Sequence, residues 1–166
     1  MNRERWGHPL RGTEGVFVAM DAPDWVLVVP VTTDGELVMV RQFRFGSADL
    51  SLEVPGGVMD PSDPDPIATA RRELLEETGF AGGEAGVAGS VFPNPALQRN
   101  RCHVVILDGV HPTGTRAFDE HEDIAMETVP VERALDLARH GGITHALVLT
   151  ALFFFEGEWR RRGRLV

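Results

Sequence analysis

Apolar residues in the first half of the chain come in short runs separated by turn residues, which is the pattern of β-strands. Between two of these runs, Thr33-Asp34-Gly35 is typical of a hairpin turn. Similar runs return after residue 85, beyond a segment with a helical pattern. We therefore predict strands over residues 15–20, 25–31, 36–45, 50–54, 86–92, 101–107 and 124–129.

Three other segments have the spacing of amphipathic helices. Residues 66–78 follow Asp65, a suitable N-cap, and they precede Gly79, which can close the C-terminus in the left-handed conformation. Residues 131–139 and 144–159 are predicted to form two further helices. The apolar arc of the first helix, expected to face a core, consists of Ile67, Ala68, Ala70, Leu74 and Leu75.

The first helix carries three carboxylates, Glu73, Glu76 and Glu77, beside its apolar arc. Negative charge near a helix C-terminus costs roughly 0.3–1 kcal/mol per group, and three like charges within one turn also repel each other. A divalent cation removes both penalties, and carboxylate oxygens suit Mg²⁺ or Mn²⁺. Arg72, four residues before Glu76, can hold that carboxylate in place. The alternative is a set of solvated charges on an exposed face.

Residues 72–80, Arg-Glu-Leu-Leu-Glu-Glu-Thr-Gly-Phe, match the second half of the Nudix box at every fixed position. The chain therefore resembles the Nudix hydrolases. The first half of the box departs from the pattern, because Pro64 stands where the box has Glu and Gly57 lies one residue too far upstream. Asp63 or Asp65 is expected to replace the missing Glu. The resemblance implies an α/β fold (α+β is the alternative label), an α/β/α sandwich with a mixed β-sheet between helices.

The resemblance also implies an activity for one domain spanning residues 1–166. Such an enzyme hydrolyses the pyrophosphate bond of a nucleoside diphosphate linked to another group, giving a nucleoside monophosphate and a phosphorylated product. Carried over by position, the expected catalytic residues are Glu120 as the general base, Glu76 and Arg72. The expected ligands of Mg²⁺ or Mn²⁺ are Glu73, Glu76, Glu77, the Gly56 carbonyl and Glu122. Glu120 and Glu122 belong to an acidic segment, and the reverse assignment of base and ligand between them is an alternative. Another interpretation of this segment is a solvent-facing loop.

The segment Arg41-Gln42-Phe43-Arg44, followed by Glu53-Val54-Pro55-Gly56-Gly57, resembles the branch that hydrolyses ADP-ribose and nucleotide sugars. Within it we expect Arg44 to contact phosphate or ribose, because a guanidinium matches phosphate oxygens. A surface charge on an edge strand is the alternative for Arg44. Arg41 and Glu53 are further candidates for substrate contact, and a bulge would bring the two arginines together.

Two later residues are also candidates for substrate contact. Pro95 lies fifteen residues after Phe80, near the position of a proline that is typical of ADP-ribose hydrolases. The neighbouring residues are Asn-Pro-Ala instead of the usual Ser-Pro-Gly, which favours a general nucleoside-diphosphate-sugar hydrolase. His103, at a predicted strand start, contacts substrate or is a half-buried structural residue.

The same branch commonly forms homodimers in which N-terminal strands complete the partner's site, and about fifty residues precede the box here. Trp6, Trp25 or Phe43 can stack on a base, although we favour core or dimer contacts for the two tryptophans. Rival functions are hydrolysis of dinucleoside polyphosphates, pyrophosphate removal from RNA ends, and non-catalytic sensing of ADP-ribose.

Composition agrees with a small-molecule enzyme. The net charge of −9 disfavours a nucleic-acid partner, which needs a basic surface. A single cysteine, Cys102, fits a reducing cytoplasm. The N-terminus lacks the apolar stretch of a signal peptide, and the apolar segment 146–155 is too short to span a membrane.

Overall fold

The computed structural model describes residues 1–114 and 124–164. Its strands are β1 (Asn2–Gly7), β2 (Glu14–Ala19), β3 (Trp25–Thr32), β4 (Glu36–Arg44), β5 (Asp49–Glu53), β6 (Gly56–Val58), β7 (Phe80–Val91), β8 (Cys102–Pro112) and β9 (Ile124–Pro130). Its helices are α1 (Pro66–Thr78), α2 (Val131–Arg139) and α3 (Ala146–Arg161). None of the helices in these two ranges is long and apolar enough to cross a membrane.

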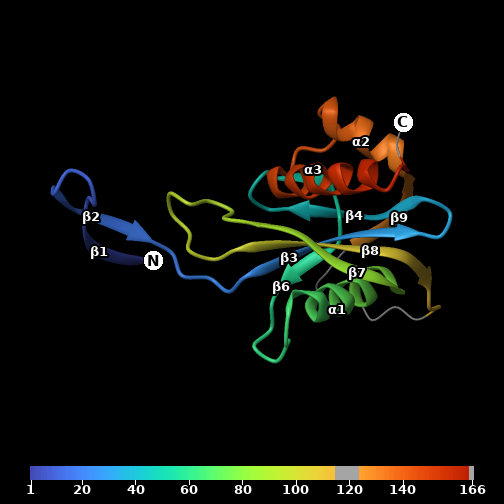
Figure 1. Ribbon diagram of the computed structural model, residues 1–166, viewed down its shortest axis with the longest axis horizontal. Helices are drawn as coiled ribbons and strands as arrows, with labels where there is room; N and C mark the ends of the chain where they lie inside the picture. Colours follow the sequence, from blue (N-terminus) through green and yellow to red (C-terminus); the bar gives the residue numbers. More distant parts are fainter. Residues whose placement is uncertain (115–123, 165–166) are drawn as a thin grey trace.

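A mixed sheet separates the helices, as predicted for an α/β/α sandwich. Its central order is β5-β4-β3-β8-β7, with β6 paired to β3 and β9 paired to β4. Helix α1 covers one face, and α2 and α3 cover the other (Figure 1). One buried cluster, which includes Leu74, lies between the sheet and α1, and a larger one, which includes Phe155, lies beneath α2 and α3.

The sheet opens on the side where the site is formed. Strand β3 pairs with β4 near their hairpin, at Val31 and Leu37, while its first residues pair with β6 instead. The far end of β4 pairs with β5 through Arg44 and Asp49. Because β3 and β4 have different partners there, a space is left between them at the end of the sheet.

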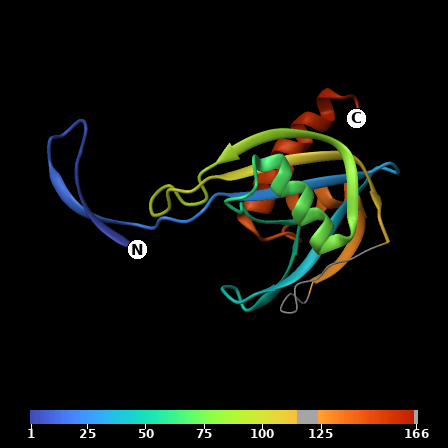
Figure 2. The ribbon, with the colours of Figure 1, turned by 90° about the horizontal axis from the view of Figure 1, so that it is seen from below.

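Strands β1 and β2 form a separate antiparallel pair. This hairpin extends away from the sandwich in both views (Figures 1 and 2). A bridge between Met20 and Gln98, in the β7–β8 connection, joins its base to the body. The sequence indicated β2 but gave no signal for β1, whose residues are polar except for Trp6.

Most predicted elements are confirmed within a few residues. Strand β6 was not predicted, and β8 continues to Pro112, beyond the expected end at residue 107. The strand expected at 86–92 is β7, which begins at Phe80, because its glycine- and alanine-rich first half becomes a strand through pairing with β8. The prediction that Leu75 is buried was wrong. Leu75 is exposed while Leu74 is fully buried, so the core-facing arc of α1 is narrower than expected.

Candidate active site

Both ends of α1 are built as the sequence predicts. The Asp65 side chain accepts a hydrogen bond of 2.9 Å from the Ala68 N–H, and Pro66 occupies the first turn. At the other end Gly79 adopts the left-handed conformation, with φ of 73°, and its N–H bonds to the Leu75 carbonyl. These caps fix the start and the phase of the helix, and therefore the direction of its acidic side chains.

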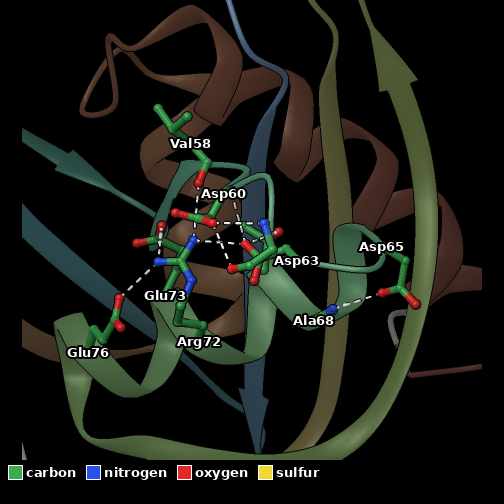
Figure 3. A network of polar contacts seen from close by, with 10 residues as sticks. Val58, Asp60, Asp63, Asp65, Ala68, Arg72, Glu73 and Glu76 are labelled. Atoms are coloured by element: carbon green, nitrogen blue, oxygen red, sulfur yellow. Dashed lines mark hydrogen bonds and ion pairs between the residues drawn. The ribbon is translucent and has the colours of Figure 1, made fainter.

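Arg72 is the centre of a polar network on the exposed side of α1 (Figure 3). Its Nη1 donates to Glu73 Oε1 at 2.8 Å and to Glu76 Oε2 at 3.0 Å. Its Nη2 donates at 3.1 Å to both the Val58 carbonyl and Asp63 Oδ2. Burial alone would lower the pKa of Arg72, but these acidic partners raise it above its ordinary value. The guanidinium is therefore a permanent cation that orients two of the three carboxylates.

Asp63 is one of the two acids expected to replace the glutamate missing from the box, and it contacts Arg72. Besides Arg72 it accepts hydrogen bonds from the Thr69 hydroxyl at 2.8 Å and from the Asp60 N–H at 3.1 Å. The bond from Arg72 lowers the pKa of Asp63, with the Thr69 bond as the next cause. Asp65 is engaged as the N-cap, so the two candidates have different tasks. The side chain at position 63 thus supports Arg72 across the enlarged loop.

The third carboxylate, Glu77, is directed at the glycine segment. Its side chain is 6% exposed, and Oε2 accepts a hydrogen bond of 3.1 Å from the Gly56 N–H. The neighbouring Gly57 lies against Glu73, since a Cβ atom at Gly57 would be 2.3 Å from Glu73 Oε1. The absence of side chains on this glycine pair lets α1 approach β6 closely enough for its acids to meet the backbone.

The donor set suits a hard divalent cation. Glu73, Glu76 and Glu77 offer carboxylate oxygens on adjacent turns, and Gly56 adds a backbone carbonyl nearby. Among the described residues, no three acidic, histidine or cysteine side chains are gathered in metal-binding geometry. The three carboxylates are hydrogen-bonded to Arg72 and to the Gly56 N–H. Glu120 and Glu122, the other expected contributors, lie outside the described residues.

A cavity of about 780 Å³ opens where β3 and β4 diverge. Its wall includes the end of β4, the glycine segment of β6 and the start of α3. A second cavity of about 610 Å³ lies beside Arg72, Glu73 and Glu76. Val58 belongs to the walls of both, so β6 lies between the large cavity and the acidic face of α1.

Arg44 and Glu53 line the large cavity as a bidentate pair. Arg44 Nε donates to Glu53 Oε1 at 2.8 Å and Nη2 donates to Oε2 at 2.6 Å. Burial raises the pKa of Glu53, but Arg44, followed by the His145 charge, outweighs it and holds the pKa below its ordinary value. His145, the N-cap of α3, and Cys102 also line this cavity. Burial raises the pKa of the Cys102 thiol to about 11, which keeps it protonated at neutral pH.

The other residues expected to contact substrate lie away from Arg44 or interact with other side chains of the protein. Arg41 forms an ion pair of 2.6 Å with Glu127 of β9, so the structure does not bring it beside Arg44. His103 Nε2 lies 3.2 Å from Asp24 Oδ2. Pro95 is exposed in the β7–β8 connection.

Sequence reasoning did not single out His145 as a site residue. The available signal was a polar residue immediately before an apolar helix, which is the pattern of an N-cap.

Comparison with known proteins gives consistent matches. A sequence model of the NUDIX domain matches residues 22–149. An ADP-ribose pyrophosphatase of Bacillus subtilis is 28% identical over 135 residues, covering 81% of this chain and 72% of that protein. A GDP-mannose pyrophosphatase of Salmonella arizonae is 31% identical over 120 residues, covering 68% and 62% respectively. A crystal structure of an ADP compounds hydrolase, 22% identical, has the same fold, with a TM-score of 0.82 over 99% of this chain and 95% of that one.

Proposed function

This chain belongs to the NUDIX family of hydrolases, and we propose that it cleaves the diphosphate linkage of ADP-ribose or of a nucleoside-diphosphate sugar. The products are a nucleoside monophosphate and a sugar phosphate. The observation that carries the proposal is the packing of an acidic helix face against a glycine segment that borders a large cavity. The names of the relatives, ADP-ribose pyrophosphatase and GDP-mannose pyrophosphatase, support this substrate class.

NUDIX hydrolases generally depend on divalent metals, and here we assign Mg²⁺ or Mn²⁺ to Glu73, Glu76, Glu77 and the Gly56 carbonyl. When bound, such a cation neutralises the diphosphate and acidifies the attacking water. Arg72 donates to Glu73 at 2.8 Å and to Glu76 at 3.0 Å, and it thereby holds both carboxylates on the helix face that would bind the ion. The Gly56 N–H holds Glu77 beside the glycine segment.

Glu120 is our candidate for the group that takes the proton from the attacking water, and Glu122 is our candidate for a further ligand. Both assignments rest on position in the sequence, in the acidic segment before β9. Arg44 is our candidate for contact with phosphate or ribose. Its bidentate pair with Glu53 fixes the plane of the guanidinium at the cavity wall, which limits the entropy lost when substrate binds.

We also propose a homodimer formed through the β1–β2 hairpin, and a cytoplasmic location as the cysteine content indicates. Trp6, Val16, Phe17 and Val18 of the hairpin are exposed, and apolar surface of this kind marks contact sites. Light scattering is expected to give twice the chain mass of 18.2 kDa. Phe17→Asp is expected to give the monomer, and a wild-type mass of one chain refutes the dimer.

The activity is tested by incubating the protein with Mg²⁺ and ADP-ribose, GDP-mannose, UDP-glucose or diadenosine polyphosphates. Alkaline phosphatase in the assay releases phosphate from the monoester products but not from an intact diphosphate linkage. Turnover of the first two compounds, lost in Glu77→Gln, supports the proposal. Turnover of diadenosine polyphosphates alone assigns a different activity. Tight ADP-ribose binding without turnover contradicts catalysis and favours a sensor.

A further inference from the structure

Phe43 in β4 and Phe45 in the turn after it are two aromatic side chains that the proposed chemistry does not use. The ring centroids of Phe43 and Phe45 are 5.4 Å apart, and the ring planes meet at 84° in an edge-to-face pair. Phe43 is 44% exposed and Phe45 is 91% exposed. The edge-to-face contact favours this arrangement of the two rings and leaves the Phe45 ring open to solvent.

This aromatic pair belongs to the large cavity. Phe43, Arg44 and Phe45 all line it, and Gly56 and Gly57 line it as well. The two rings contact each other, while the side chain of Arg44, which lies between them in the sequence, reaches Glu53. The cavity thus offers two apolar rings, a guanidinium and the glycine segment beside the acidic helix.

We propose that Phe43 and Phe45 form a stacking platform for the nucleobase of the substrate, and that the platform favours purines over pyrimidines. The proposal rests on the proposed function, since the diphosphate is then taken to lie between Arg44 and the glycine segment. A planar base has a π-face that matches an open aromatic ring, and a bicyclic purine covers more of the ring than a pyrimidine does. The cavity volume of about 780 Å³ lies within the range of sites that enclose a whole small ligand.

The two tryptophans considered from the sequence are less suited to this task. Trp6 lies on the separate hairpin, where its Nε1 donates to Glu4 at 3.0 Å and Arg99 lies 6.0 Å from its ring. Trp25 is partly buried at the cavity wall. Phe45 therefore offers the most accessible aromatic ring of the cavity wall, while Phe43 supports it from the side.

The first experiment compares kcat/KM for ADP-glucose, UDP-glucose and a base-free diphosphate of two riboses. In Phe45→Ala we expect the ratio of ADP-glucose to base-free hydrolysis to fall about tenfold, as for the loss of one stacked base. Phe45→Trp is expected to restore the ratio. The matched control is Phe153→Ala, because Phe153 is also an exposed phenylalanine, at 75%, and contacts Phe154 in a T-shaped pair on α3. This control should leave the ratio unchanged.

Several outcomes overturn the proposal. An unchanged ratio of ADP-glucose to base-free hydrolysis in Phe45→Ala does so, and if kcat/KM falls equally on both substrates, the residue has a structural role. A wild-type enzyme without preference for ADP-glucose over UDP-glucose overturns the purine part. If Phe45→Ala converts a dimer to a monomer in light scattering, the patch is an interface between two copies of the chain.

A binding measurement separates failure of the platform from failure of the proposed activity. Fluorescence of an etheno-ADP-ribose probe is followed with the protein in EDTA, and stacking quenches it. Quenching by the wild type but not by Phe45→Ala supports the platform even if no substrate is hydrolysed. Equal quenching by both proteins contradicts it, whatever the activity.

Discussion

Replacing Gly57 by alanine places a methyl group where the carboxylate of Glu73 now lies. The added Cβ would be 2.3 Å from Glu73 Oε1 and 2.5 Å from Cδ. To restore ordinary contact, the carboxylate must move by about 1 Å, a displacement that can reduce catalysis about 100-fold when it affects a positioned group. We expect kcat/KM for ADP-ribose to fall by about this factor, with weaker Mg²⁺ binding in calorimetry.

The stability of the Gly57→Ala variant should not fall. Gly57 is not among the residues with left-handed backbone, so alanine is compatible with its conformation. The clash is with the end of a flexible side chain, and the smaller entropy of the unfolded chain favours alanine by about 0.4–1 kcal/mol. A urea midpoint equal to or above that of the wild type, with an unchanged slope, is the expected result.

Two other glycines provide controls for this prediction. A Cβ at Gly86 would have nothing within 4 Å, so Gly86→Ala should keep both activity and stability. A Cβ at Gly56 would be 2.3 Å from the Val26 carbonyl oxygen, so Gly56→Ala should lower stability by separating β6 from β3. Wild-type kcat/KM and Mg²⁺ affinity in Gly57→Ala would refute the reasoning that the position of Glu73 limits catalysis.

Three further changes test the acidic helix and the cavity wall. Glu77→Gln should lower kcat/KM about 1,000-fold because it removes a metal-ligating charge, while circular dichroism and urea midpoints stay the same; near-normal turnover would exclude Glu77 from the mechanism. Asp63→Asn should lower kcat/KM about 10- to 100-fold by removing the charged partner that holds Arg72 at 3.1 Å, and an unchanged Mg²⁺ dependence would contradict this role. Arg44 holds the pKa of Glu53 in the folded protein below its value in the unfolded chain. The ionised Glu53 therefore adds to the free energy of unfolding above about pH 4.3, and this stabilisation is lost as the pH falls through the folded pKa. Denaturant titrations between pH 7 and 3 should therefore show a smaller acid-induced loss in Glu53→Gln than in the wild type, and equal losses would refute the assignment.

Much of the fold could be predicted from the sequence because the signals for its helices and strands act within a few residues. Asp65, Pro66 and Gly79 set the ends of α1 through backbone conformation and capping, which act within one turn of the helix. The continuous apolar runs of β3 and β8 predict buried strands, because a strand covered on both faces of the sheet has apolar residues on both sides. β1 and the first half of β7 lack this signal, since their residues gain strand conformation from pairing and not from burial.

The candidate site also has some features that the sequence predicts and others that depend on the tertiary structure. Residue order alone placed Glu73, Glu76 and Glu77 on one stretch of helix beside an apolar arc, and helical periodicity makes that placement independent of the rest of the chain. The replacement for the missing box glutamate was narrowed to Asp63 or Asp65 by sequence position. The structure shows that Asp63 contacts Arg72 while Asp65 caps the helix, a difference that depends on the loop conformation and could not be predicted from sequence position.

The sequence by itself determined that this protein has a capped acidic helix, a glycine segment before it and alternating strands around it. Only the tertiary structure decided that Arg41 pairs with Glu127 while Arg44 joins Glu53 at a cavity, and that Phe43 and Phe45 stand at its wall. The physical reason is that capping and periodicity act over a few residues. A cavity wall, by contrast, is assembled from strands and helix ends that are distant in the chain and meet only through the pairing of the sheet.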